Sequence, residues 1–130
     1  MIVGIGIDII DNRRIQKLIN KYNIKFKKKC FTKGEINRSE KINQKINFFS
    51  KRYAAKEACA KALGLGLSNG IVWKDIEVIN DKYGKPLIKL HKKALLRLQN
   101  IADCKFKIEV SLSDEKNYSI ANVIIIKDEK

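Results

Sequence analysis

The chain has 130 residues, of which 45% are hydrophobic and 32% are charged. These values are typical of one globular domain with its own core, and they argue against an intrinsically disordered chain. The formal net charge of +14 favours acidic partners and phosphate-bearing ligands. No apolar run approaches the roughly 20 residues of a membrane span, and the N-terminus lacks a signal-peptide pattern. We therefore expect a single cytoplasmic domain over residues 1–130, with no membrane segment.

The three cysteines, Cys30, Cys59 and Cys104, are odd in number and widely spaced. This spacing argues against a disulfide framework and against a zinc site. Cys59 lies in an unusual alanine-rich segment, so a nucleophilic role is conceivable, but no candidate base stands beside it. We favour a packing role, because an unpaired cysteine usually behaves as a small hydrophobic residue.

The first third of the chain predicts a strand and two helices. Residues 2–10 are mostly apolar, as in a largely buried strand. Asp11 is suited to cap a following helix, whose apolar face carries residues at helical spacing: Ile15, Leu18, Ile19 and Tyr22. Thr32 and Glu35 then give the capping-box pattern that begins a second, short helix.

A longer helix is predicted over residues 45–63, and Gly64 and Gly66 are suited to end it. The second half of the chain predicts two hairpins around one more helix. Its predicted elements are strands 75–80 and 87–90 joined by a turn over 81–86, a helix over 92–102, and strands 106–112 and 118–126 joined by a turn over 113–117. This order predicts an α+β fold with a mainly antiparallel sheet.

Residues 52–62 are the most informative stretch, because they carry charged side chains among five alanines. Glu57 and Lys61 are four residues apart and therefore share one helical face. Because a helix buried only for packing would carry Leu or Ile, we interpret the alanines as room for a large ligand. Asp8 interrupts the apolar strand, where a carboxylate is costly unless a charge compensates it. Two acids set in apolar elements suggest a shared divalent cation.

These two segments resemble the signatures of the 4'-phosphopantetheinyl transferases. The first is GIGIDII at residues 4–10, followed by Arg14, and the second is FSKRYAAKEACAKA at residues 49–62. Further matching motifs follow in the order usual for the family: Gly64-x-Gly66, DIEV at 75–78, Gly84-Lys85-Pro86 and SLSD at 111–114. Each motif alone is weak, but six in order are specific, and the length resembles that of the short bacterial type.

The resemblance implies an enzyme that moves 4'-phosphopantetheine from coenzyme A to a serine of an acyl carrier protein, in support of fatty acid biosynthesis. It also implies a homotrimer with sites between subunits. Asp8 and Glu57 match the family's metal-binding acids, and Mg²⁺ suits them because it binds one or two carboxylates together with substrate phosphates. Lys61 can neutralise the diphosphate or protonate the leaving group, and Glu57 is our candidate proton acceptor. An ordinary surface ion pair is the simpler alternative for Glu57 and Lys61.

Other residues are candidates for binding coenzyme A. Arg52 and Lys56 are expected to line its phosphates, or are solvated. The glycines at 64 and 66 are expected to let the nucleotide approach, or only to end the helix. The remaining candidates are Gly84, Lys85, Pro86 and Ser113. Some relatives carry histidine where this chain has Asp114, and an aspartate cannot bind phosphate without a metal or a bridging water.

A basic stripe is predicted on the first helix, where Arg14, Lys17 and Lys21 lie opposite the apolar face. Such a stripe would steer and orient an acidic carrier protein, or it is a solvated face of a lysine-rich chain. Two other classes of function stay open from sequence. A nucleic-acid-binding module lacks its usual aromatic or zinc motifs, so we expect no nucleic acid partner. A metal-dependent nucleotide pyrophosphatase would usually need more carboxylates.

Overall fold

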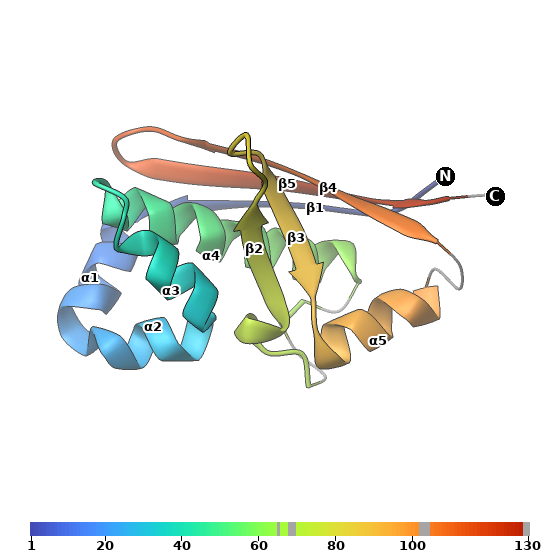
Figure 1. Ribbon diagram of the computed structural model, residues 1–130, viewed down its shortest axis with the longest axis horizontal. Coiled ribbons are helices and arrows are strands. Elements are labelled where there is room, and N and C mark those ends of the chain that lie inside the picture. The colour runs from blue at the N-terminus through green and yellow to red at the C-terminus, as the bar shows by residue number, and fades with distance from the viewer. Residues whose placement is uncertain (65, 68–69, 102–104, 129–130) are drawn as a thin grey trace.

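Figure 1 shows the computed structural model, in which one long helix lies between a three-stranded sheet and a two-stranded sheet. The structure describes residues 1–64, 66–67, 70–101 and 105–128. The elements in chain order are β1 (Ile2–Asp11), α1 (Asn12–Tyr22), α2 (Ile24–Cys30), α3 (Lys33–Ser39), α4 (Lys45–Ala62), the 3-10 turn η1 (Trp73–Asp75), β2 (Ile76–Asn80), β3 (Pro86–Leu90), α5 (Lys92–Ile101), β4 (Phe106–Asp114) and β5 (Tyr118–Lys127).

The strands form two antiparallel sheets, which confirms the predicted α+β class. The larger sheet has the order β1-β5-β4, and the β2–β3 hairpin forms the smaller one. Asp8 pairs with Ala121 of β5 in the register of the larger sheet. Since β1 lies at an edge of that sheet, its free side is available to another chain or ligand.

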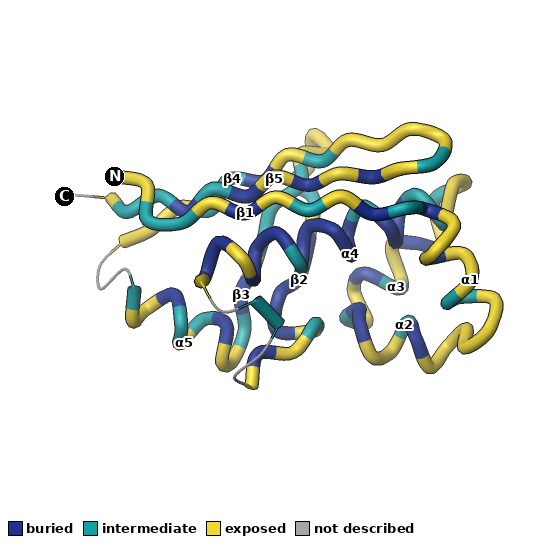
Figure 2. Tube along the Cα trace, turned by 180° about the vertical axis from the view of Figure 1, so that it is seen from behind, coloured by how far each residue is buried: buried dark blue, intermediate teal, exposed yellow. Residues whose placement is uncertain are grey.

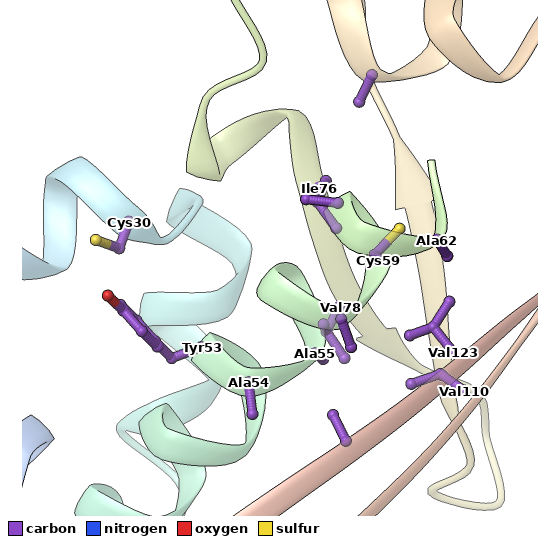
Figure 3. Close-up of a cluster of buried hydrophobic side chains, with 14 of the residues drawn as sticks. Cys30, Tyr53, Ala54, Ala55, Cys59, Ala62, Ile76, Val78, Val110 and Val123 are labelled. Carbon is purple, nitrogen blue, oxygen red and sulfur yellow. The ribbon is translucent and has the colours of Figure 1, made fainter. Parts of the chain in front are cut away.

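Helix α4 is the centre of the molecule and is buried along most of its length (Figure 2). One side packs on β1 and β5, and another contacts β2. Helices α1, α2 and α3 gather near one end of α4, whereas α5 lies near the other (Figure 1). In the close-up of Figure 3, small side chains of α4 point toward Val78 of β2 and toward Val110 and Val123 of the larger sheet. The hydrophobic core therefore surrounds α4.

Local signals for the helix starts are confirmed. The Asp11 side chain accepts a hydrogen bond from the Arg13 amide at 2.9 Å and caps α1. The Thr32 hydroxyl accepts from the Glu35 amide, and Glu35 accepts from the Thr32 amide in return, which completes the predicted capping box.

Helix α2 was not predicted, because four of the seven residues 24–30 are lysines and no apolar periodicity stands out. Its burial explains why it forms: Phe26 and Cys30, one turn apart, are 7% and 3% exposed. The predicted strand 75–80 begins one residue later, since Asp75 belongs to η1. The last residue of the predicted helix 92–102 lies outside the described residues, as does Cys104.

Candidate active site

Two glycines bring β1 into direct contact with α4. A Cβ atom added to Gly4 would overlap the carbonyl oxygen of Ala62, and one added to Gly6 would overlap that of Ala58. Only glycine lets the strand backbone approach the helix backbone so closely. Because alternate strand residues share one face, Asp8 follows Gly6 on the side that meets the helix.

Asp8 lies beside Lys61 at the meeting point of β1 and α4. The Lys61 ammonium is 3.2 Å from Oδ1 of Asp8, and it also donates a hydrogen bond to the carbonyl oxygen of Ile7 at 3.0 Å. The Asp8 side chain is 17% exposed and that of Lys61 is 50% exposed. The strand carboxylate is therefore compensated by a cation and can still be reached from solvent.

Glu57 lies one helical turn from Lys61 and is half-buried. Burial raises the pKa of the Glu57 carboxyl, and the negative charge of Asp8 raises it further, against the opposing effect of Lys61 and Arg14. On α4, Glu57 is one turn before Lys61, whose ammonium is 3.2 Å from Asp8. The structure thus brings Asp8, Glu57 and Lys61 together in one acidic and basic cluster.

The cluster offers the donor atoms that a hard divalent cation prefers. Two carboxylates and the nearby carbonyl oxygen of Ile7 are all oxygen ligands. Within the described part of the chain, no group of three or more His, Cys, Asp or Glu residues could hold a metal. A cation at Asp8 and Glu57 would therefore need water or substrate phosphates to complete its shell, which is the usual arrangement for Mg²⁺. The residues fit Mg²⁺.

The first helix places Arg14 next to this cluster. Its guanidinium donates a hydrogen bond of 3.4 Å to the Tyr53 hydroxyl and lies 5.6 Å from the centre of the Tyr53 ring. Tyr53 is one turn before Glu57 on α4, and the Arg14 charge acts on the Glu57 carboxyl. Lys17 and Lys21 continue along the exposed side of α1. The predicted stripe is thus a solvent-facing surface that begins at the acids.

A second concave region lies elsewhere on α4, and we call it the Arg52 cavity. It has a volume of about 310 Å³ and is lined by α4, the β2–β3 hairpin and the end of β4. Its lining residues include Arg52, Asn80, Gly84 and Pro86. None of the residues of the Asp8 cluster lines it. Two predicted sets of binding residues therefore occupy two separate places on one chain.

Arg52 is almost fully buried against this cavity, at 4% exposure. Its guanidinium donates to the Asn80 side-chain oxygen at 2.5 Å and stacks over the Phe48 ring at 4.0 Å. Its Nε atom is buried without a hydrogen-bond partner. Burial lowers the pKa of Arg52 to about 10, so the group is still a cation at neutral pH. A cation that lines a cavity suits an anionic ligand.

The remaining candidates are placed as follows. Gly64 and Gly66 have φ angles of 87° and 63°, and the Gly66 amide donates to the Ala60 carbonyl, so both end α4. Lys85 projects from the β2–β3 turn and lies 3.6 Å from a carboxylate oxygen of Glu109. Ser113 is exposed near the end of β4. The structure does not bring these residues to the Asp8 cluster within one chain.

Lys56 is not placed where it could line a phosphate. Its side chain is fully buried, and its ammonium lies 2.7 Å from Oε1 of Glu35. It also donates to the carbonyl oxygens of Trp73 and Ile76. All three donors of the ammonium are used inside the protein, so Lys56 joins α4 to α3 and β2 and does not face a ligand.

The alanines of α4 also serve a different purpose from the one predicted. Ala54, Ala55, Ala58 and Ala60 are completely buried, and Ala58 lies under Gly6 of β1. Their small size admits the sheet, and not a ligand, close to the helix. Cys59 is equally buried, and burial raises the pKa of its thiol to about 12. An un-ionised buried thiol is a poor nucleophile.

Sequence reasoning missed residues that line the Arg52 cavity. Lys51 and Asn47 are four apart on α4, and both contact Asp114 at the end of β4. Their helical spacing was the available signal. What the sequence could not supply was the position of the β4 end beside this helix.

The fold and the cluster together describe the class: an α+β protein in which two acids and a lysine meet where β1 contacts α4. The sequence pattern of the 4'-phosphopantetheinyl transferase superfamily matches residues 4–123. The chain therefore belongs to this family.

Individual relatives agree along nearly the whole chain. The chain is 44% identical to a holo-[acyl-carrier-protein] synthase of Bartonella henselae over 127 residues, 96% of each chain. It is similar to the crystal structure of that synthase from Neisseria meningitidis, with 32% identity, a TM-score of 0.86 and coverage of 98% and 100%. A synthase from Bacillus anthracis in complex with CoA (3',5'-ADP) is 33% identical, with a TM-score of 0.81 and coverage of 98% and 99%. No helix among the described residues is long and apolar enough to span a membrane.

Proposed function

We propose that this protein transfers the 4'-phosphopantetheine group of coenzyme A to a serine of apo-acyl-carrier-protein and releases adenosine 3',5'-bisphosphate. The observation that carries the proposal is the convergence of Asp8, Glu57 and Lys61 in a chain of this family. The activity serves fatty acid biosynthesis, as in an acyl-carrier-protein synthase. A cytoplasmic location, expected from the sequence, is part of the proposal.

The reaction exchanges the phosphoanhydride bond of the diphosphate for a phosphate ester bond to serine. The serine oxygen attacks the phosphorus that carries the pantetheine arm, and the bond from that phosphorus to the bridging oxygen of the diphosphate breaks. The serine loses a proton while negative charge grows on the departing phosphate. Glu57 is suited to accept the proton, because its pKa is raised. Lys61 is suited to neutralise the departing phosphate.

Asp8 and Glu57 are the residues that would hold Mg²⁺, as the sequence predicted. Bound there, the ion would neutralise charge on the diphosphate. The Lys61 ammonium contacts Asp8, and this contact supports a role for Lys61 in binding the same phosphates. Arg14 of α1 is near enough for its charge to lower the pKa of Glu57, which supports entry of the carrier serine from the side of α1.

The stripe of Arg14, Lys17 and Lys21 is the proposed carrier-docking surface. All three residues are exposed on α1. Acyl carrier proteins are strongly acidic, so charge complementarity would speed their encounter and orient the serine toward Glu57.

A homotrimer with sites between subunits is the proposed assembly. On the outer face of β1, the side chains of Ile5, Ile7 and Ile9 are 62%, 56% and 63% exposed. Such an apolar row on an edge strand is typical of an interface. Within one chain the Arg52 cavity and the Asp8 cluster are separate. In the proposed trimer, the Arg52 cavity of a neighbouring copy would lie next to the Asp8 cluster.

The test is to incubate the protein with coenzyme A, Mg²⁺ and apo-acyl-carrier-protein and to weigh the carrier by mass spectrometry. We expect a mass gain of one phosphopantetheine on the carrier and release of adenosine 3',5'-bisphosphate. A carrier without the active serine serves as the control. No mass gain under varied metal and pH would defeat the proposal.

A further inference from the structure

Among the described residues that line the Arg52 cavity, Asp114 is the one carboxylate. Its two oxygens are already engaged by α4: Oδ2 accepts a hydrogen bond from the Asn47 amide at 2.7 Å, and Oδ1 lies 3.3 Å from the Lys51 ammonium. Asn47 also donates to the Glu115 carbonyl at 3.2 Å. The end of β4 is thus tied to α4 by side chains.

This arrangement fixes the position of Lys51. The Asp114 and Lys51 side chains are 26% and 31% exposed, so their ion pair is sheltered from full solvent screening. An ammonium has three donors and Asp114 uses one, which leaves donors for a ligand. An unpaired lysine side chain would otherwise sample many rotamers, and holding it in place lowers the entropic cost of binding.

The charge of the cavity favours a dianion. Arg38, Lys51 and Arg52 contribute three cations and Asp114 one anion. Arg38 and Arg52 are near enough for the charge of one to lower the pKa of the other. The cavity therefore has a net positive charge, which suits a phosphate monoester.

We propose that Asp114 is a positioning residue, which together with Asn47 holds Lys51 as a cation for the 3'-phosphate monoester of coenzyme A. The proposal rests on the proposed function, because that function makes coenzyme A the substrate. Asp114 does not touch the phosphate itself. Its carboxylate acts through Lys51, so the acid contributes to anion binding although its own charge opposes it.

The choice of phosphate follows from the two separate sites. Coenzyme A carries a diphosphate in its chain and a monoester at the ribose 3' position. The proposed reaction takes place at the diphosphate, which belongs with Asp8 and Glu57. The Arg52 cavity contains none of the residues of that cluster. We therefore assign it to the 3'-phosphate monoester.

The test compares two ligands that differ only in that monoester. Binding of coenzyme A and of 3'-dephospho-coenzyme A is measured by calorimetry on the full chain, and the discrimination is the ratio of the two dissociation constants. For the unmodified protein we expect a ratio of roughly tenfold or more in favour of coenzyme A, the scale of one charge-assisted hydrogen bond.

The variants separate positioning from simple charge. Lys51→Met keeps the unbranched stem and removes the ammonium, so the ratio should fall to about one third or less of its starting value. Asp114→Asn should lower the ratio as well, although removal of a negative charge near an anion would raise it if Asp114 acted only through its field. The double variant should be no worse than Lys51→Met, because both changes act on the same contact.

Lys28→Ala on the exposed side of α2 is the matched control for lost positive charge, and it should leave the ratio unchanged. Thermal melting checks the fold of each variant. For transfer, both variants should raise KM for coenzyme A and leave KM for the dephospho form unchanged, a split that general damage to the fold would not produce.

The outcomes distinguish this inference from the proposed function. A higher ratio in Asp114→Asn, or an unchanged ratio in Lys51→Met, overturns the inference while transfer to the carrier still supports the transferase. Equal binding of both ligands by the unmodified protein also overturns it. Failure to bind either ligand and failure to modify the carrier would instead reject the proposed function.

Discussion

Glu57 carries its carboxylate on a helix face where Asp8 is a close like charge and Lys61 is one turn away. Burial and Asp8 together raise its pKa. A carboxyl with a raised pKa is a stronger base than an ordinary one, and this is useful for proton abstraction. The same environment disfavours the ionised form in the folded protein without metal, so a functional site here has a cost in stability.

Glu57→Gln should stabilise the metal-free protein at neutral pH, by no more than about 1 kcal/mol because solvent screens a half-buried group. A raised pKa means that the folded protein binds the proton more tightly than the unfolded chain, so the Glu57 contribution to stability falls as pH rises through that pKa. The gain should therefore vanish in acid, where Glu57 is protonated. Urea unfolding at several pH values measures it, and a variant less stable than the parent at neutral pH would contradict the account.

Two lysines of α4 were predicted to bind phosphate, but the structure places them in different environments. Lys61 was predicted to lie at the site and is 50% exposed beside Asp8. Lys56 was also predicted to bind phosphate, but it is buried against Glu35. The sequence could not separate them, because α4 is covered on several sides and its exposed face is set by distant elements. Only the position of Glu35 at the start of α3 shows which lysine is structural.

At the scale of elements, the buried pair of Lys56 and Glu35 joins α3, α4 and β2. Glu35 accepts from the Val78 amide at 3.1 Å in addition to its capping bond. Loss of one partner leaves an uncompensated buried charge, which typically costs 3–5 kcal/mol. The pair therefore fixes the orientation of the short helix against the hairpin.

Lys56→Met should lower the free energy of unfolding by about 3 kcal/mol or more. Because its donors are spent inside the protein, affinity for coenzyme A should be unchanged wherever the variant is folded. Urea denaturation and calorimetry measure the two quantities, with Lys33→Met on the exposed start of α3 as the control. If the free energy of unfolding fell by less than about 1 kcal/mol and coenzyme A bound more weakly, Lys56 would have to be assigned to the binding site instead.

The α1 stripe predicts an effect on one ligand only. Arg14→Glu should weaken binding of the carrier protein by roughly tenfold, while binding of coenzyme A changes much less. Higher salt should weaken carrier binding in the same selective way, because exposed charges are screened. Surface plasmon resonance with immobilised carrier measures this, and Lys28→Glu on α2 is the charge-matched control. Equal losses of affinity for the carrier protein and for coenzyme A would show that α1 has no specific role in carrier binding.

Most elements were predictable because their signals are local. The cap at Asp11, the capping box at Thr32 and the alternation in the last two strands are each contained in a few residues. Helix α2 was not predicted, because its two buried residues, Phe26 and Cys30, lie among four lysines. Division of the strands into two sheets depends on α4 passing between them (Figure 1), and this is a tertiary property.

At the scale of the whole molecule, the outer face of β1 is the main apolar surface that the proposed trimer must cover. Ile7→Lys should shift the protein toward monomers and reduce transfer by more than about tenfold, because a buried unpaired charge at an interface is costly. Sedimentation measures the mass, and Ile24→Lys on exposed α2 is the control. A variant that still sediments as a trimer and keeps full activity would disprove this interface.

The proximity of Asp8 and Glu57 was predictable from two acids in apolar elements and from the family resemblance, and their shared metal stays a prediction. The Arg52 cavity was predictable only in part, since Arg52, Gly84 and Pro86 were named but Lys51 and Asn47 were not. The difference is physical. Residues of one motif can be recognised from their spacing in the sequence, whereas a cavity is formed by elements that are far apart in the chain.

The most direct test of the account is titration of Mn²⁺ into the protein in the presence of coenzyme A, for the parent chain and for Asp8→Asn, Glu57→Gln and the double variant. We expect one bound ion per chain, a loss of ion affinity of at least roughly tenfold in each single variant, and a greater loss in the double variant. Unchanged ion affinity together with full transfer activity in Asp8→Asn would contradict it.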